Sequence, residues 1–152
     1  MKIYDYIEEI TKYTRDPYDI ATDLGYFIHF HDTGNDILAF HYCDDQAKII
    51  CLNQNLSEEK SLFVLSHEIG HALMHSHISF SQFRKDTLCS AEKMEREANM
   101  FAAILLFSHL DELNFTELSN TYEIEKDVLK QILGQHLGFE PFWKLKKQAT
   151  AT

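Results

Sequence analysis

Residues 57–74 read SEEKSLFVLSHEIGHALM and have the pattern of a long helix, with Ser57 as its N-cap. His67 and His71 are four residues apart, so they lie on one side of that helix, and both imidazoles can reach one metal ion. Glu68 lies beside them, where it can take a proton from a water that the metal activates. This H-E-x-x-H spacing is the pattern of zinc peptidases.

The motif alone is a weak signal, because a chain rich in His and Glu can contain it by chance. The alternative is a polar helix face with two exposed histidines. Apolar residues on both sides of the motif, at 62–65 and 72–74, indicate instead that the helix is mostly buried. Two buried histidines and a glutamate need polar partners, and a metal ion supplies them.

A catalytic zinc site needs a third protein ligand and an open position. The candidates lie on a second apolar helix, expected at 90–107, in the segment EKMEREAN at 92–99. Glu95 and Asn99 share one stripe of that helix, whereas Glu97 points about 200° away from Glu95 and is expected in solvent. Glu95 can therefore ligate zinc, while Asn99 hydrogen-bonds the outer nitrogen of a motif histidine.

The motif at 67–71, followed by EREANMFAAILL from Glu95, resembles the ImmA/IrrE family of metallopeptidases over roughly residues 15–107. The resemblance implies a gluzincin-like zinc (Zn2+) site of His67, His71 and Glu95, with Glu68 as the catalytic residue. It also implies a zinc endopeptidase that cleaves a helix-turn-helix repressor of a prophage or mobile element and so releases the repressed genes.

Strand-like segments at 26–31, 37–43 and 48–52 precede the motif helix and are joined by turn sequences. We therefore expect an α+β fold in which a small antiparallel sheet packs against a zincin-like pair of active-site helices. Residues 78–90 are mixed in polarity and predict no regular element. Further helices are expected at 2–13, 16–24, 115–122 and 125–136.

The last part of the chain predicts a short helical appendage, so we divide the chain into a zincin-like domain at 1–110 and an appendage at 111–152. The stretch LSNTYEIEKDVL at 118–129 has the rhythm of a helix-turn-helix pair. It can bind DNA, or it can be a cap that packs on the peptidase body or receives the substrate. Glu125 and Asp127 offset the lysines of the presumed recognition helix, so direct nucleic-acid binding is not expected.

The composition suits one compact domain with a small appendage, since 45% of the 152 residues are hydrophobic. The three cysteines form no C-x-x-C pair, and we find no signal peptide or membrane span, so a cytoplasmic location is expected. The formal net charge of −10 disfavours nucleic acid and anionic membranes as partners. An acidic surface is compatible with a basic, DNA-binding protein as substrate. The sequence does not settle the oligomeric state.

A tetrahedral oxyanion needs a donor beyond the metal, and the sequence does not identify it. His75 continues the stripe of the motif histidines by one turn and is a possible transition-state donor. The other candidates are Tyr42, His77 and His109. The remaining histidines are expected on the surface or in strands: His29, His31, His41 and His136.

The main alternative to a peptidase is a non-proteolytic, metal-binding regulatory or interaction protein that retains the peptidase fold. The intact Glu68 argues against this alternative, because a purely structural zinc site needs no base at that position.

Overall fold

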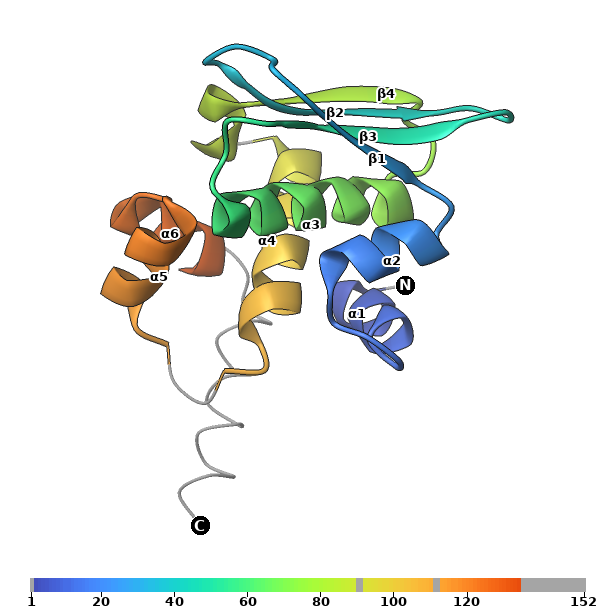
Figure 1. The fold of residues 1–152 in the computed structure, drawn as a ribbon. Helices are drawn as coiled ribbons and strands as arrows, with labels where there is room; N and C mark the ends of the chain where they lie inside the picture. Colours follow the sequence, from blue (N-terminus) through green and yellow to red (C-terminus); the bar gives the residue numbers. More distant parts are fainter. Residues whose placement is uncertain (1, 90–91, 111–112, 135–152) are drawn as a thin grey trace.

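The computed structural model describes residues 2–89, 92–110 and 113–134, which form an α+β fold with one four-stranded sheet and six α-helices (Figure 1). In chain order the elements are α1 (Ile3–Ile10), α2 (Pro17–Asp23), β1 (Phe27–His31), β2 (Ile37–Cys43), β3 (Lys48–Asn53), α3 (Glu58–Met74), β4 (Phe80–Arg84), the 3-10 helix η1 (Lys85–Cys89), α4 (Lys93–Phe107), α5 (Phe115–Tyr122) and α6 (Lys126–Gly134). Every expected helix is present, although positions 90–91 and 135–136 of the expected ranges lie outside the described residues. No described helix is long and apolar enough to cross a membrane.

The sheet is mixed, so the expectation of an antiparallel sheet is wrong for one strand pair. The strand order is β1-β3-β2-β4, and β1 pairs in parallel with β3, whereas β2 pairs antiparallel with both β3 and β4. The cause is the tight β2–β3 hairpin, in which the Asp44 carboxylate accepts hydrogen bonds from the N–H groups of Gln46 and Ala47. Since β3 occupies that edge of β2, β1 adds to the free edge of β3, where it runs in the same direction.

The other edge of the sheet is β4, which the sequence pattern did not predict. Phe83 on its inner side is 1% exposed and pairs with Ala39, whereas Phe80 on its outer side is 56% exposed. Ser81 lies on the inner side as well, opposite His41 of β2. β4 thereby brings one polar and one aromatic side chain to the inner face of the sheet.

The α-helices all lie on one face of the sheet, and α3 runs along that face directly beneath the strands (Figure 1). Ile50 and Leu52 of β3 point toward α3 and are fully buried. Phe63 and Ile69 of α3 join the same core. The residues of α3 that face the sheet therefore lie in an environment from which water is largely excluded.

α3 and α4 approach each other closely at Gly70. A Cβ atom at this position would lie 3.1 Å from three side-chain atoms of Phe101 on α4, which is tighter than ordinary van der Waals contact. The small side chains of Ala98 and Ala102 are also fully buried on α4. This close approach places the N-terminal half of α4 against the motif residues of α3.

α5 and α6 pack against the same core. Leu118, Ile124 and Leu129 are buried in the cluster that also contains the α3 and α4 side chains. The Lys60 ammonium of α3 donates a hydrogen bond of 2.8 Å to the backbone carbonyl of Glu123, between α5 and α6. The division at residue 110 and the helix-turn-helix interpretation stay predictions, and residues 135–152 of the expected appendage lie outside the described residues.

Candidate metal centre

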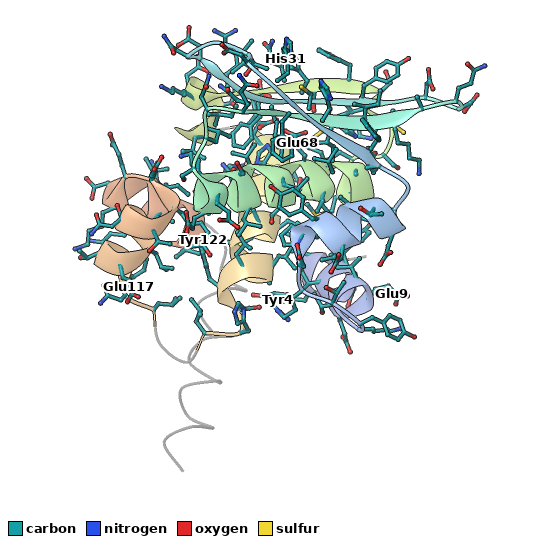
Figure 2. The ribbon with its side chains drawn as sticks, viewed as in Figure 1. Tyr4, Glu9, His31, Glu68, Glu117 and Tyr122 are labelled. Carbon is teal, nitrogen blue, oxygen red and sulfur yellow. The ribbon has the colours of Figure 1, made fainter. Side chains whose placement is uncertain are left out.

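α3 carries both motif histidines into the layer between the helices and the sheet. The helix begins after Ser57, whose hydroxyl accepts a hydrogen bond from the N–H of Lys60. His67 and His71 are 0% and 1% exposed, and their ring centroids are 4.7 Å apart. Figure 2 shows Glu68 at the same level, between α3 and the strands. The alternative of two solvent-exposed histidines is therefore excluded.

α4 supplies a carboxylate at this level. Glu95 Oε2 lies 3.2 Å from Nε2 of His67, and Glu95 Oε1 lies 3.1 Å from Nε2 of His71. The two Nε2 atoms are themselves 3.1 Å apart. One ligand atom from each residue lies within 4.8 Å of the others. The structure thus brings together the three residues to which the helical stripes and the family resemblance point.

The hydrogen bonds behind His67 determine which of its ring nitrogens has a lone pair. The side-chain amide nitrogen of Asn99 donates to the Leu88 carbonyl at 3.1 Å, so its oxygen faces Nδ1 of His67 at 2.8 Å. An amide oxygen only accepts, so Nδ1 carries the hydrogen and Nε2 has the lone pair. That lone pair points toward Glu95 and His71. Such converging lone pairs repel unless a cation lies among them, and the set therefore fits a metal ion.

His71 is supported by a second histidine on the side away from Glu95. Nδ1 of His71 lies 2.9 Å from Nδ1 of His75, and Nε2 of His75 lies 3.6 Å from Oε1 of Glu97. His75 is 5% exposed, and the side chain of Glu97 is 27% exposed. Glu97, which we expected in solvent, thus lies at the end of a polar chain that leads from His71 toward the surface.

Glu68 is buried but has few partners. Its Oε2 atom is 3.5 Å from the Ser81 hydroxyl, and its Oε1 atom has no hydrogen-bond partner in the described part of the chain. Burial raises the pKa of Glu68 well above its ordinary value, the charge of Glu95 adds to this, and the Ser81 hydrogen bond opposes it. A buried carboxylate with a raised pKa and a free oxygen is suited to accept a proton.

The ionisation of the ligand residues suits metal binding. Burial lowers the pKa of His67 to about 4, against the raising effect of Glu95. Burial alone would raise the pKa of Glu95, but the adjacent imidazoles of His67 and His71 hold it below its ordinary value. At neutral pH the imidazole of His67 is therefore uncharged and the carboxylate of Glu95 is ionised, which are the forms that bind a metal.

Two side chains of β4 contact the cluster, and neither was a candidate from the sequence. The ring of Phe83 stacks on His67 with centroids 3.7 Å apart, and the hydroxyl of Ser81 faces Glu68. The segment FSQFR at 80–84, with two phenylalanines among polar residues, was a weak signal for a strand. It was too short to stand out within a segment of mixed polarity.

The other histidines and Tyr42 do not join the cluster. His41 is buried on the inner face of β2, and its Nε2 lies 2.9 Å from the hydroxyl of Tyr26. Burial lowers the pKa of His41 to about 4, with a further contribution from His71. His136 lies outside the described residues. The remaining candidates have exposed side chains: His29, His31, Tyr42, His77 and His109.

The chain matches one family model and two known proteins. A family model described as the IrrE N-terminal-like domain, a peptidase family, matches residues 21–134. The uncharacterized immunity region protein 2 of Bacillus phage phi105 is 37% identical over 98 residues, which are 64% of this chain and 62% of that protein. Metallopeptidase ImmA of Bacillus subtilis strain 168 is 28% identical over 97 residues, which are 62% of this chain and 56% of that protein. The chain therefore matches less than two thirds of the length of either relative.

Proposed function

Because the chain belongs to the ImmA/IrrE family of metallopeptidases, we propose that it is a zinc-dependent endopeptidase that cleaves a helix-turn-helix repressor of a prophage or mobile element. The observation that carries the proposal is the convergence of His67, His71 and Glu95 beside a buried Glu68. Two imidazoles and one carboxylate are the ligand set of a catalytic zinc site with an open position.

His67, His71 and Glu95 would hold the zinc ion. A bound zinc ion would act there as a Lewis acid toward a carbonyl and would lower the pKa of water. Glu68 accepts the proton of the attacking water and passes it to the leaving amine. The free Oε1 atom of Glu68 and its buried surroundings support this role.

Asn99, His75 and Glu97 act in this proposal as positioning residues. Asn99 fixes the ring of His67, and His75 fixes the ring of His71 from the side opposite Nε2. The position of His75 favours support of His71 over direct contact with the substrate. The donor to the oxyanion stays unassigned.

β4 supports an extended peptide as the substrate. It is an edge strand, since β2 pairs with one side of it and no described strand pairs with the other. A peptide added to that edge would form main-chain hydrogen bonds along the strand that carries Ser81, which faces Glu68. The scissile bond would then pass close to the proposed base.

The repressor is proposed as the substrate on two grounds. The phi105 relative is named as an immunity region protein, and this name favours a phage repressor as the substrate. The formal charge of −10 on this chain favours association with a basic DNA-binding protein. A non-proteolytic metal-binding regulator that keeps the fold is the alternative, and Glu68 distinguishes the two.

The test is a cleavage assay with the zinc-loaded protein and the helix-turn-helix repressor encoded nearest to its gene. We expect one or a few defined fragments by mass spectrometry, and no fragments with Glu68→Gln. Cleavage that Glu68→Gln leaves unchanged would remove the catalytic assignment. Binding of the repressor without cleavage, by a protein whose zinc content is complete, would favour the regulator.

A further inference from the structure

A second concave site lies apart from the metal ligands, where the end of the sheet, the first turn of α3, η1 and the α5–α6 turn meet. It is a cavity of about 430 Å³, and its walls include two lysines and three asparagines. Its lining includes Asn35, Lys60, Lys85, Leu88 and Glu123. The proposed catalytic residues do not line this cavity.

Lys60 is the more buried of the two cations. Its side chain lies at the start of α3 and the residue is 8% exposed, which is unusual for a lysine. Its ammonium donates one hydrogen bond, to the backbone carbonyl of Glu123, within the part of the chain that the structure describes. An ammonium group has three N–H donors, and a buried charge is stabilised when they are all satisfied. Lys60 therefore retains donor capacity toward the cavity.

Lys85 contributes the second positive charge, from an exposed position at the start of η1. Burial lowers the pKa of Lys60, the exposed Glu123 carboxylate opposes this effect, and the charge of Lys85 makes a smaller lowering contribution. Both lysines line the same cavity, so their positive charges face one shared space. Two lysines on one cavity are notable in a chain with 14 basic and 24 acidic residues. An anion between them would relieve their repulsion.

We propose that this cavity binds a small anion, whose phosphate or carboxylate oxygens lie between Lys60 and Lys85, with the amide of Asn35 on the same wall. Both oxygen groups accept charge-assisted hydrogen bonds from ammonium donors. The volume leaves room for a substituent beyond the anionic group.

The occupant would also contact a wall that supports the metal centre. Leu88 lines the cavity, and its carbonyl accepts the hydrogen bond of the Asn99 amide, whose oxygen holds His67. An anion that fixes Leu88 would therefore favour one orientation of His67. Thermodynamic linkage requires that the metal and the anion change each other's affinity by the same factor.

The test measures binding of inorganic phosphate and of succinate to the full chain by titration calorimetry, at constant ionic strength. We expect saturable binding of at least one anion, and the stronger of the two identifies the preferred oxygen group. Lys85→Met should weaken binding by about tenfold or more, because a charge-assisted hydrogen bond is lost. Lys60→Met should weaken it as well. Lys85→Met is the decisive variant, because no described contact of its side chain supports the fold.

Lys12→Met is the matched control, since it removes the same charge from the turn after α1, where the Lys12 ammonium contacts only Glu9 among the described residues. It should leave anion binding unchanged. The proposal is overturned if neither anion binds saturably, or if Lys85→Met changes affinity by less than about twofold. It is equally overturned if Lys12→Met weakens binding as much as Lys85→Met does. These outcomes do not depend on peptidase activity, so they are separable from a failure of the proposed function.

Discussion

The two motif histidines, His67 and His71, are neighbours of Glu68 in the chain, but the histidines and the glutamate are held in opposite ways. His67 and His71 each have a hydrogen bond at Nδ1, to Asn99 and His75, which fixes the ring and directs Nε2 toward the cluster. Glu68 has one oxygen without a described partner and a long contact of 3.5 Å from the other to Ser81. Hydrogen bonds therefore hold both histidine rings in place. The Glu68 carboxylate beside them is buried, and most of its hydrogen-bonding capacity is unused.

The difference follows from what each group has to do. A ligand binds best when its lone pair is aimed before the metal arrives, so hydrogen bonds behind the ring raise affinity. A general base has to exchange a proton with water and substrate, so partners from the protein would compete with its task. A buried carboxylate without partners destabilises the fold, and such local departures from good packing are expected at functional sites.

Removal of the metal should have the largest effect, because neither the proposed ligand residues nor Glu68 can act in catalysis without it. Dialysis against a chelator should eliminate peptidase activity, and addition of zinc should restore it. The chelated protein should also unfold at a lower temperature, with a loss of about 4 kcal/mol where zinc had been present at a thousandfold its Kd. Activity that persists in metal-free protein would show that the cluster is not the catalytic centre.

Glu68→Gln should separate the role of Glu68 in catalysis from metal binding by His67, His71 and Glu95. Activity should fall by about 10²–10⁴-fold, the usual contribution of a general base, while zinc content stays complete. The metal-free variant should be more stable than the parent by on the order of 1 kcal/mol, since the parent must bury a charge or take up a proton at neutral pH. Metal analysis and thermal unfolding measure both effects.

Glu117→Gln is the control for that variant, because it makes the same change on an exposed side chain of α5 (Figure 2). It should alter neither activity nor stability. A Glu68→Gln protein that loses its zinc would mean that Glu68 holds the ion rather than the proton.

The proximity of His67, His71 and Glu95 could be predicted from the sequence because helical periodicity places each of them on a defined face of its helix. The four-residue spacing of His67 and His71, and the shared stripe of Glu95 and Asn99, fix which side chains face one another once α3 and α4 pack. The chain from His71 through His75 to Glu97 could not be predicted. Glu97 lies on another side of α4, and its approach to His75 depends on how α4 crosses α3.

The fold was predictable to a similar depth. The strand-like stretch at 37–43, which ends at a turn sequence, predicted the bounds of β2, and Ser57 marked the start of α3. The order of the strands was not predictable, because a local pattern does not say which free edge β1 will join. β4 was not predicted for a related reason, because its five residues form a strand by pairing with β2. The positions of Ser81 and Phe83 beside Glu68 and His67 were therefore not predicted either.

Asn99→Ala should test how the proposed ligand His67 is held, because it removes the hydrogen bond between Nδ1 of His67 and the amide oxygen of Asn99. Without its acceptor the imidazole can rotate or change tautomer, so zinc affinity should fall by about 10–100-fold. Competition with a chromophoric chelator measures the change. Asn99→Asp retains an acceptor for Nδ1 and should restore most of the affinity. If both variants bind zinc as the parent does, the ring of His67 is held by packing against Phe83 rather than by the amide.

Glu97→Gln should have the smallest effect on zinc affinity. It tests whether His71 is held as firmly through His75 as His67 is held by Asn99. The carboxylate is partly exposed and lies 3.6 Å from His75, and exposed ion pairs contribute about 0–1 kcal/mol, so zinc affinity should fall by less than about fivefold. Glu125→Gln, on an exposed residue before α6, is the matched control and should have no effect. A loss as large as that of Asn99→Ala would mean that the charge of Glu97 reaches His71 through His75. The two histidines would then be held with equal strength, one by an amide and the other by a carboxylate acting through an imidazole.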